Sequence, residues 1–199
     1  MEEEDYILEL QTYFQEFADK VVSQTKEALY NAKGNSTNLG DSIRAEVVYS
    51  EVEEKISIMF YMLDYGTYVN QGVAGNEAAA SQTYTNWRGE VVNSDFAYSD
   101  KMPPVAVIEE WVKKKGIKGR KSLKKYRKNK TGTIKGAGQF ITNKSLAFAI
   151  SKSIQKKGIK STSFFTKPFG SLYSELKEGI APILKNKIQD MYFTTFTKF

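Results

Sequence analysis

The side chains that could do chemistry in this sequence are carboxylates, lysines, serines and tyrosines, because it contains neither histidine nor cysteine. A disulfide, a thiolate metal site and a cysteine nucleophile are therefore excluded, and the commonest general base is missing. Carboxylate-bound magnesium and serine–lysine or tyrosine-based mechanisms stay open. The carboxylate pairs Glu53–Glu54 and Glu109–Glu110 lie on a predicted loop tip and a predicted helix surface, where a solvated role is favoured. Neither a Walker-type loop nor a dinucleotide fingerprint is present. We therefore expect no enzyme, no metal and no cofactor.

The charges divide sharply along the chain. Residues 1–110 carry 7 Lys/Arg and 20 Asp/Glu, a net charge of −13, whereas residues 111–199 carry 22 Lys/Arg and 3 Asp/Glu, a net charge of +19. Such asymmetry favours a polyanionic partner or self-association of an acidic surface with a basic one. The alternative is a solvated surface whose two halves neutralise each other within one fold.

Length and hydrophobicity indicate one domain over residues 1–199, with an α+β fold. Hydrophobic residues make up 41% of the chain, which suffices for a packed core. No apolar run approaches the length of a membrane span, and the acidic segment Met1–Asp5 is unlike the basic start of a secretory signal.

The expected elements are a long N-terminal helix, a two-stranded antiparallel hairpin and three later helices. Apolar residues recur at three- and four-residue steps in the helices and alternate in the strands. The helices are predicted over residues 5–32, 103–115, 144–157 and 171–191, and the strands over 42–49 and 55–62. Pro182 predicts a kink or break in the last helix near Gly179.

A tyrosine-rich corner follows the second strand, over Asp64–Gly72. The spacing of its apolar residues predicts one or two helical turns, with Asp64 as N-cap and Gly72 as the stop. With no catalytic group near it in sequence, we interpret the corner as a packing and assembly element. Its candidate subunit contacts are Tyr65, Tyr68, Val69 and Gln71.

Two insertions and a tail complete the predicted organisation. Residues 73–102 lack periodicity, which is typical of a lid or of an arm that reaches a neighbour, and the missing catalytic groups favour the arm. Residues 117–139 are basic and poor in apolar side chains. The tail 192–199 is aromatic and β-prone. The aromatic candidates for subunit contacts here are Phe164, Phe165 and Phe196. The candidate contacts to DNA or an acidic partner are Arg120, Lys121, Lys124, Lys125, Arg127 and Lys128.

The order of short motifs resembles a known family. A polar turn ends in Leu-x-x-Ser-Ile (Leu39–Ile43), two strands follow, and then a Tyr-x-x-Tyr-Val-x-x-Gly corner (Tyr65–Gly72). A Pro-Pro helix with a tryptophan, the Ala147–Ile150 segment and the Phe164–Phe165 pair come after. In this order the sequence is similar to the neck, or tail-completion, proteins of tailed bacteriophages.

The resemblance implies a structural virion protein that forms a homo-oligomeric ring at the head–tail junction. It implies portal or connector and tail proteins as partners and DNA passing through the ring, whereas the short apolar runs predict no membrane partner. Such a ring needs heterologous contacts, which the acidic and basic halves could supply. A basic nucleic-acid-binding protein acting through residues 113–135 is the alternative that the lysine-rich stretch leaves open.

Overall fold

The structure, a computed structural model, describes residues 3–33, 38–77, 81–120 and 141–196, and of residues 3–4 and 186–196 the backbone alone. The predicted fold class is confirmed: the protein is α+β, with long N- and C-terminal helices and small antiparallel sheets of two strands each. In chain order the elements are α1 (Glu3–Lys33), α2 (Asn38–Ser42), β1 (Arg44–Ser50), β2 (Lys55–Tyr61), α3 (Gly66–Gln71), β3 (Val73–Ala74), β4 (Thr83–Thr85), β5 (Val91–Asn93), α4 (Val105–Lys114), α5 (Asn143–Lys157), β6 (Gly158–Ile159) and α6 (Thr166–Phe196).

The chain divides into two compact units, where the sequence led us to expect one domain with insertions. The first unit consists of Met1–Gly72, Thr83–Asn93 and Ser161–Phe199, and the second of Val73–Gln82 and Ser94–Lys160. The division arises because most residues between 73 and 160 pack on one another instead of joining the core around α1.

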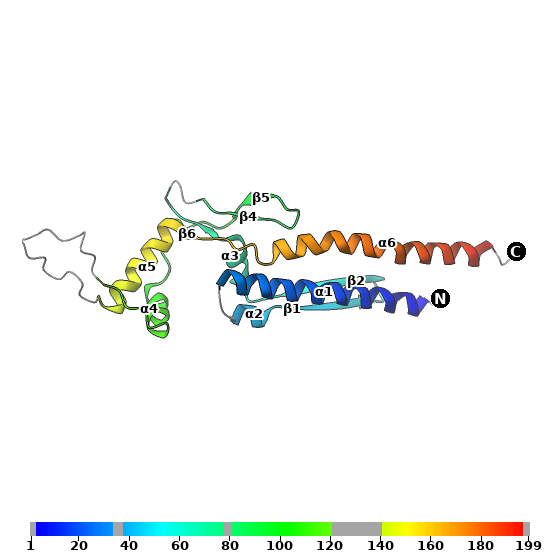
Figure 1. The fold of residues 1–199 in the computed structure, drawn as a ribbon, viewed down its shortest axis with the longest axis horizontal. Coiled ribbons are helices and arrows are strands. Elements are labelled where there is room, and N and C mark those ends of the chain that lie inside the picture. Colours follow the sequence, from blue (N-terminus) through cyan, green and yellow to red (C-terminus); the bar gives the residue numbers. More distant parts are fainter. Residues whose placement is uncertain (1–2, 34–37, 78–80, 121–140, 197–199) are drawn as a thin grey trace, which may run out of the picture. The chain divides into compact units, whose positions relative to one another are not determined.

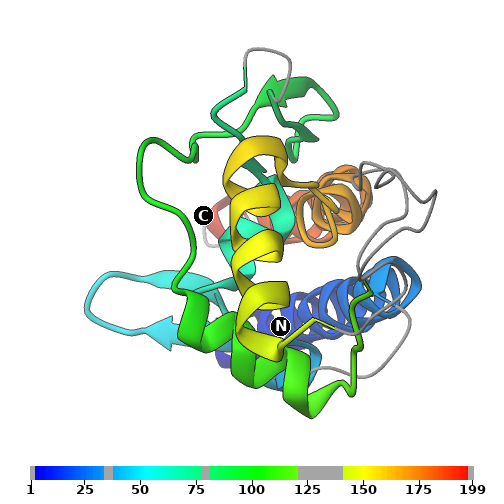
Figure 2. The same cartoon turned by 90° about the vertical axis from the view of Figure 1, so that its left-hand side faces the viewer.

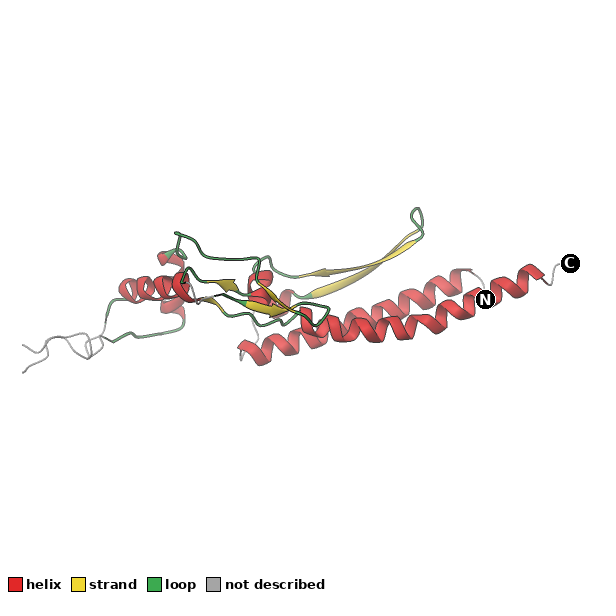
Figure 3. Ribbon diagram, turned by 90° about the horizontal axis from the view of Figure 1, so that it is seen from above, coloured by secondary structure: helices red, strands yellow, loops and turns green. Residues whose placement is uncertain are grey.

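The first unit is built on α1 and α6, which lie side by side and run in opposite directions (Figures 1 and 3). The antiparallel hairpin β1–β2 lies along this helix pair, with Val47 paired to Ile58 at its middle. Phe17 and Val21 of α1 and Leu172 of α6 are buried together, and Ile58 and Phe60 of β2 pack against them. The predicted apolar face of the hairpin therefore packs against the helices.

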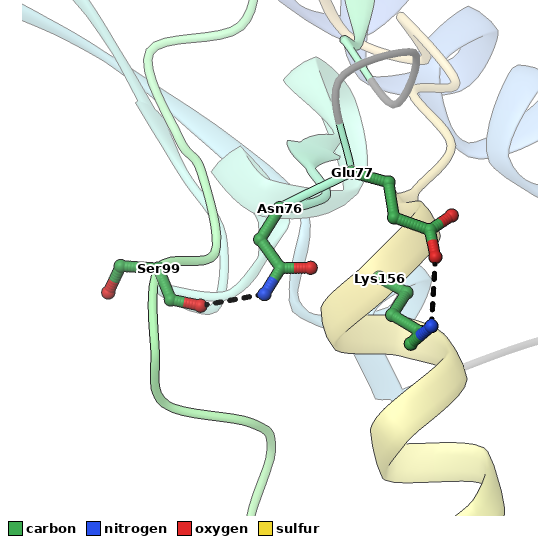
Figure 4. A network of polar contacts seen from close by, with 4 residues as sticks. All are labelled: Asn76, Glu77, Ser99 and Lys156. Atoms are coloured by element: carbon green, nitrogen blue, oxygen red, sulfur yellow. Dashed lines mark hydrogen bonds and ion pairs between the residues drawn. The ribbon is translucent and has the colours of Figure 1, made fainter.

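The second unit pairs α4 with α5, which lie beside each other in Figure 2, α4 in green and α5 in yellow. Two short strands, β3 and β6, pair antiparallel, and Ala74 also forms a bridge with Ala97. A polar network surrounds this pairing (Figure 4). In it, Asn76 Nδ2 donates to the Ser99 carbonyl at 3.3 Å and Lys156 Nζ lies 3.0 Å from Glu77 Oε1. These bonds join the loop after β3 to the segment at Ser99 and to the last turn of α5.

The last helix differs from its prediction in three respects. It begins at Thr166 instead of residue 171, runs without a break past Gly179 and Pro182, and continues to Phe196. Of the predicted kink or break near Gly179, the break is therefore wrong, and the prediction of a β-prone tail from residue 192 is wrong as far as Phe196, which is helical. A strand without a partner would leave its backbone groups unpaired, whereas extending a helix adds one internal hydrogen bond per residue.

Candidate assembly surface

The tyrosine-rich corner forms the short helix α3, and its two tyrosines point outward. Tyr65, directly before the helix, and Tyr68, within it, are 46% and 45% exposed, although the helix packs on the core. Gly72 ends the helix as predicted, with φ of 77° and its N–H donating to the Tyr68 carbonyl at 2.9 Å. The predicted N-cap at Asp64 is wrong, because the N-cap position is Tyr65 and has no side-chain cap. Gln71 is half-buried at the end of α3.

The inner side of the corner packs on the core of the first unit. Val69 contacts a buried cluster that contains Leu39, Ile43 and Phe164. Gly66 lies so close to Met62 and Leu39 that a larger side chain would displace them. The corner is thus fixed from inside while its tyrosines remain accessible.

Asn70 connects the corner to the start of α6. Its side chain is only 6% exposed, and its Oδ1 accepts hydrogen bonds from the backbone N–H of Phe165 at 3.0 Å and of Thr166 at 3.3 Å. The backbone carbonyl of Asn70 accepts from the N–H of Ser163 at 2.9 Å. The first amides of a helix have no partner within it, so Asn70 caps α6 from a distant part of the sequence.

The two phenylalanines that follow have different surroundings. Phe164 is fully buried in the cluster with Leu39, so it offers no surface to another subunit in this conformation. Phe165 is half-buried, stacks on Phe169 with ring centroids 5.7 Å apart, and meets Phe60 edge-on. Both predicted contact residues therefore pack within the first unit.

The outer face of the β1–β2 hairpin is accessible. Val48 and Met59 are 37% and 39% exposed there. The Arg44 guanidinium lies 4.4 Å from the centroid of the Tyr61 ring, and the Tyr61 hydroxyl donates to Glu46 at 3.2 Å. Within the described ranges neither outer edge of the hairpin has a strand partner. Free edges of this kind are ready to pair with another chain.

A groove of about 540 Å³ lies beside the tip of this hairpin. Apolar side chains from the start of α1, the hairpin and α6 form most of its wall. Its lining residues are Tyr6, Ile7, Leu10, Phe14, Tyr49, Glu51, Glu54, Lys55, Ile56 and Ile180. Together with the exposed hairpin face it gives the first unit apolar surface that a neighbouring molecule could cover.

Part of the predicted arm at residues 73–102 packs on its own chain. Its middle, residues 83–93, forms the hairpin β4–β5 within the first unit. Thr85 N–H donates to Ser163 Oγ at 2.9 Å, and the Trp87 ring meets Tyr173 edge-on at 5.4 Å. This stretch therefore packs against α6 and does not project from the first unit as an arm.

The predicted basic contacts fall almost entirely on a stretch that the structure leaves undescribed. Arg120 is exposed in the second unit, whereas Lys121, Lys124, Lys125, Arg127 and Lys128 lie outside the described residues. Phe196 is the last residue of α6, and its side chain is also outside them.

Two observations bear on chemistry. In the described ranges no three carboxylates are grouped so as to hold a metal ion. Burial raises the pKa of the Tyr98 phenol above its ordinary value of 10.0. Tyr98 lies in the second unit, where its N–H donates to the Ala74 carbonyl at 2.8 Å.

Sequence reasoning missed two residues that hold the first unit together around the corner and α6. Asn70 stands between Val69 and Gln71 in a pattern that indicates only a helix end, and nothing in it points to a partner 95 residues away. Trp87 was one of several scattered aromatics, and its contact with Tyr173 depends on a hairpin without strong periodicity.

Comparison with known proteins adds no relative. No family model matches the chain, and neither the curated proteins nor the solved structures give a significant match. A helix long and apolar enough to cross a bilayer does not occur among the residues that the structure describes.

Proposed function

We propose that this chain is a structural protein of a tailed-bacteriophage virion that assembles as a homo-oligomeric ring at the head–tail junction. Its role is neck or tail completion, with portal or connector and tail proteins as partners and DNA passing through the ring. The role is mechanical and requires no catalytic step.

The convergence of the family-like motifs carries this proposal. Leu39 and Ile43 of the first motif, Val69 of the corner and Phe164 of the Phe-Phe pair meet in one cluster. Ser42, also in the first motif, accepts a bond from the Leu63 N–H at 3.1 Å. Segments separated by up to 125 residues therefore meet in one cluster, and this convergence supports the proposal.

Exposed apolar surface supports assembly. Tyr65 and Tyr68 stand outward on a helix held firmly from inside, and Val48 and Met59 lie on an accessible hairpin face. Tyrosine and methionine are enriched at protein interfaces, because they supply large contact area next to a polar rim.

Opposite charge on the two units supports heterologous contacts. By sequence the first unit holds 11 Lys/Arg and 18 Asp/Glu, a net charge of −7, and the second 18 Lys/Arg and 5 Asp/Glu, a net charge of +13. A ring closes when one patch of each subunit meets a different patch of the next. Attraction between the first unit of one copy and the second unit of its neighbour would favour this head-to-tail arrangement of subunits.

The test is the assembly state of the purified protein, alone and with portal and tail proteins, by native mass spectrometry and negative-stain electron microscopy. We expect rings whose population falls as salt rises from about 0.1 to 1 M, because screening weakens contacts between charged surfaces. We also expect the protein in purified virions. A strict monomer under all these conditions that is absent from virions would overturn the proposal.

The variant Tyr68→Ala tests whether the corner itself forms the contact between subunits. We expect it to shift the protein towards smaller species at the same concentration. Tyr30→Ala is the matched control, because Tyr30 is a tyrosine 56% exposed in the same unit, on α1. Melting curves of both variants separate loss of assembly from loss of folding. Equal effects of the two variants on assembly would show that the corner is not part of the interface.

A further inference from the structure

A second groove lies within the first unit, where the β4–β5 turn rests against α6. It has a volume of about 610 Å³, and among the residues that the structure describes no acidic one lines it. Its lining residues are Thr85, Asn86, Trp87, Arg88, Gly89, Lys167, Gly170, Ser171, Tyr173, Ser174 and Lys177. The absence of acidic side chains is notable because the unit as a whole is acidic.

Three cations face this groove: Arg88, Lys167 and Lys177. The Arg88 guanidinium lies 4.6 Å from the Trp87 ring centroid, and Lys177 Nζ lies 4.9 Å from that of Tyr173. None of the three forms a salt bridge with a carboxylate of the described chain. Contact with the ring faces positions two of the charges without neutralising them, so they remain available to an anion.

The groove is held in shape by the backbone around it. Thr85 is tied to Ser163 and to Thr166 through hydrogen bonds to its N–H and its carbonyl. The Trp87 carbonyl comes so close to Gly170 that any Cβ at that position would collide with it. The turn and the helix therefore form a preorganised site, and little ordering is needed before a ligand binds.

We propose that this groove binds the phosphodiester backbone of a nucleic acid. Phosphate oxygens accept from several donors at once, and the groove offers two ammonium groups, a guanidinium and the hydroxyls of Ser171 and Ser174. Trp87, which is 40% exposed, adds an aromatic surface of the kind that nucleic-acid grooves place among their cations. At about 0.1 M salt charges are screened over roughly 10 Å, so an anion in the groove responds to these cations more than to the unit's net charge.

This site is separate from the lysine-rich segment that the sequence suggests as a nucleic-acid contact. It also stands independently of ring formation, because binding is measured on the purified full chain in whatever assembly state it adopts. Failure of the binding test would leave the ring proposal intact, and a monomeric protein could still bind through the groove.

The test is fluorescence anisotropy with a labelled 20-base-pair duplex and a labelled 20-nucleotide oligo-dT, each at several salt concentrations. The variant carries Arg88→Gln, Lys167→Gln and Lys177→Gln. Each phosphate contact contributes about 0.9 to the salt slope of duplex binding and about 0.7 to that of a single strand. We therefore expect the slope to fall by about 2 to 3 and affinity at low salt to fall by roughly tenfold or more. The two probes distinguish a duplex from a single strand as the source of the phosphates.

The matched control neutralises three exposed lysines of α1 in the same unit: Lys20→Gln, Lys26→Gln and Lys33→Gln. It changes the net charge equally, so it should leave the salt slope nearly unchanged. Equal losses in the two triple variants, or no loss in the groove variant, would overturn the proposal. Groove-dependent binding of polyglutamate as tight as that of DNA would overturn it too, by assigning the groove to an acidic protein surface.

Tryptophan emission provides a local readout. The chain has two tryptophans, so Trp111→Phe leaves Trp87, which lines the groove, as the sole reporter. We expect DNA to change Trp87 emission, and the groove triple variant to abolish that change. DNA binding with no change in Trp87 emission would place the site elsewhere and refute the assignment.

Discussion

Replacing Asn70 with alanine tests whether a tertiary cap holds the first unit together. The side chain is 6% exposed, and its Oδ1 is the acceptor for the N–H groups of Phe165 and Thr166. Removing it leaves two donors at the start of α6 without their acceptor. An unsatisfied buried donor costs about 1–3 kcal/mol, and a lost helix cap costs about 0.5–2 kcal/mol. The second bond, at 3.3 Å, is the weaker, so we expect a loss of about 2–4 kcal/mol.

Urea unfolding in a Trp111→Phe background measures this loss, because Trp87 then reports on the first unit alone. For a chain of this size, each 1 kcal/mol of lost unfolding free energy lowers the melting temperature by roughly 2–4 °C, so the Asn70→Ala variant should melt roughly 5–15 °C lower. Asn70→Asp keeps an acceptor at the positive end of the helix dipole and should retain most of the stability at neutral pH. Asn31→Ala, at an exposed position of α1, should change stability by less than about 0.5 kcal/mol.

Two outcomes would refute this reasoning about Asn70. If the alanine variant stays within about 0.5 kcal/mol of wild type, the two amides find other partners at little cost. If the aspartate variant is destabilised as much as the alanine variant, the shape or packing of the amide matters, and its acceptor oxygen does not.

Two further substitutions test close packing in the first unit. Gly170→Ala should lower the free energy of unfolding by about 1–3 kcal/mol, because the new methyl group would collide with the Trp87 carbonyl. Ser171→Ala, on the next residue of α6, is the control and should cost less than about 0.5 kcal/mol in the same melting experiment. Equal losses of stability in the two variants would contradict the close approach of Gly170 to Trp87. Thr25→Val should stabilise the unit by about 1 kcal/mol in urea unfolding, since the fully buried Thr25 hydroxyl has no partner among the described residues. Thr12→Val is the control and should show no such gain, because the Thr12 hydroxyl donates to the Leu8 carbonyl at 2.8 Å.

Periodicity predicted the elements of this fold well because each has one buried face. Phe17 and Val21 lie on the predicted apolar face of the first helix and are buried, and Ile43, which begins the predicted alternating pattern, is buried directly before β1. Gly72 was correctly predicted as a stop, because its positive φ is a conformation that glycine adopts without strain. These features depend on residues within a few positions of one another, so the sequence pattern is sufficient.

Features that depend on distant partners could not be predicted in this way. The start of α6 is set by Asn70, which lies about 95 residues earlier, and local propensity placed that start five residues too late. The hairpin β4–β5 is short, and its position follows from contacts of Thr85 and Trp87 with the region around α6. The late start of α6 and the missed hairpin both depend on where distant segments meet, whereas the long segments were correctly predicted as helix or strand.

The same distinction explains why the interface candidates separate into two groups. A sequence pattern marks a large aromatic residue without showing which side of an element it occupies. Phe164 proved to be a core residue, whereas Tyr65 and Tyr68 lie on the outer side of a helix whose inner side is fixed by Val69 and Asn70. An exposed aromatic on a firmly held element loses little conformational entropy when a partner covers it, because the backbone beneath it is already ordered. The corner is for that reason a stronger candidate for subunit contact than the Phe-Phe pair, and substitutions there should affect assembly before they affect folding.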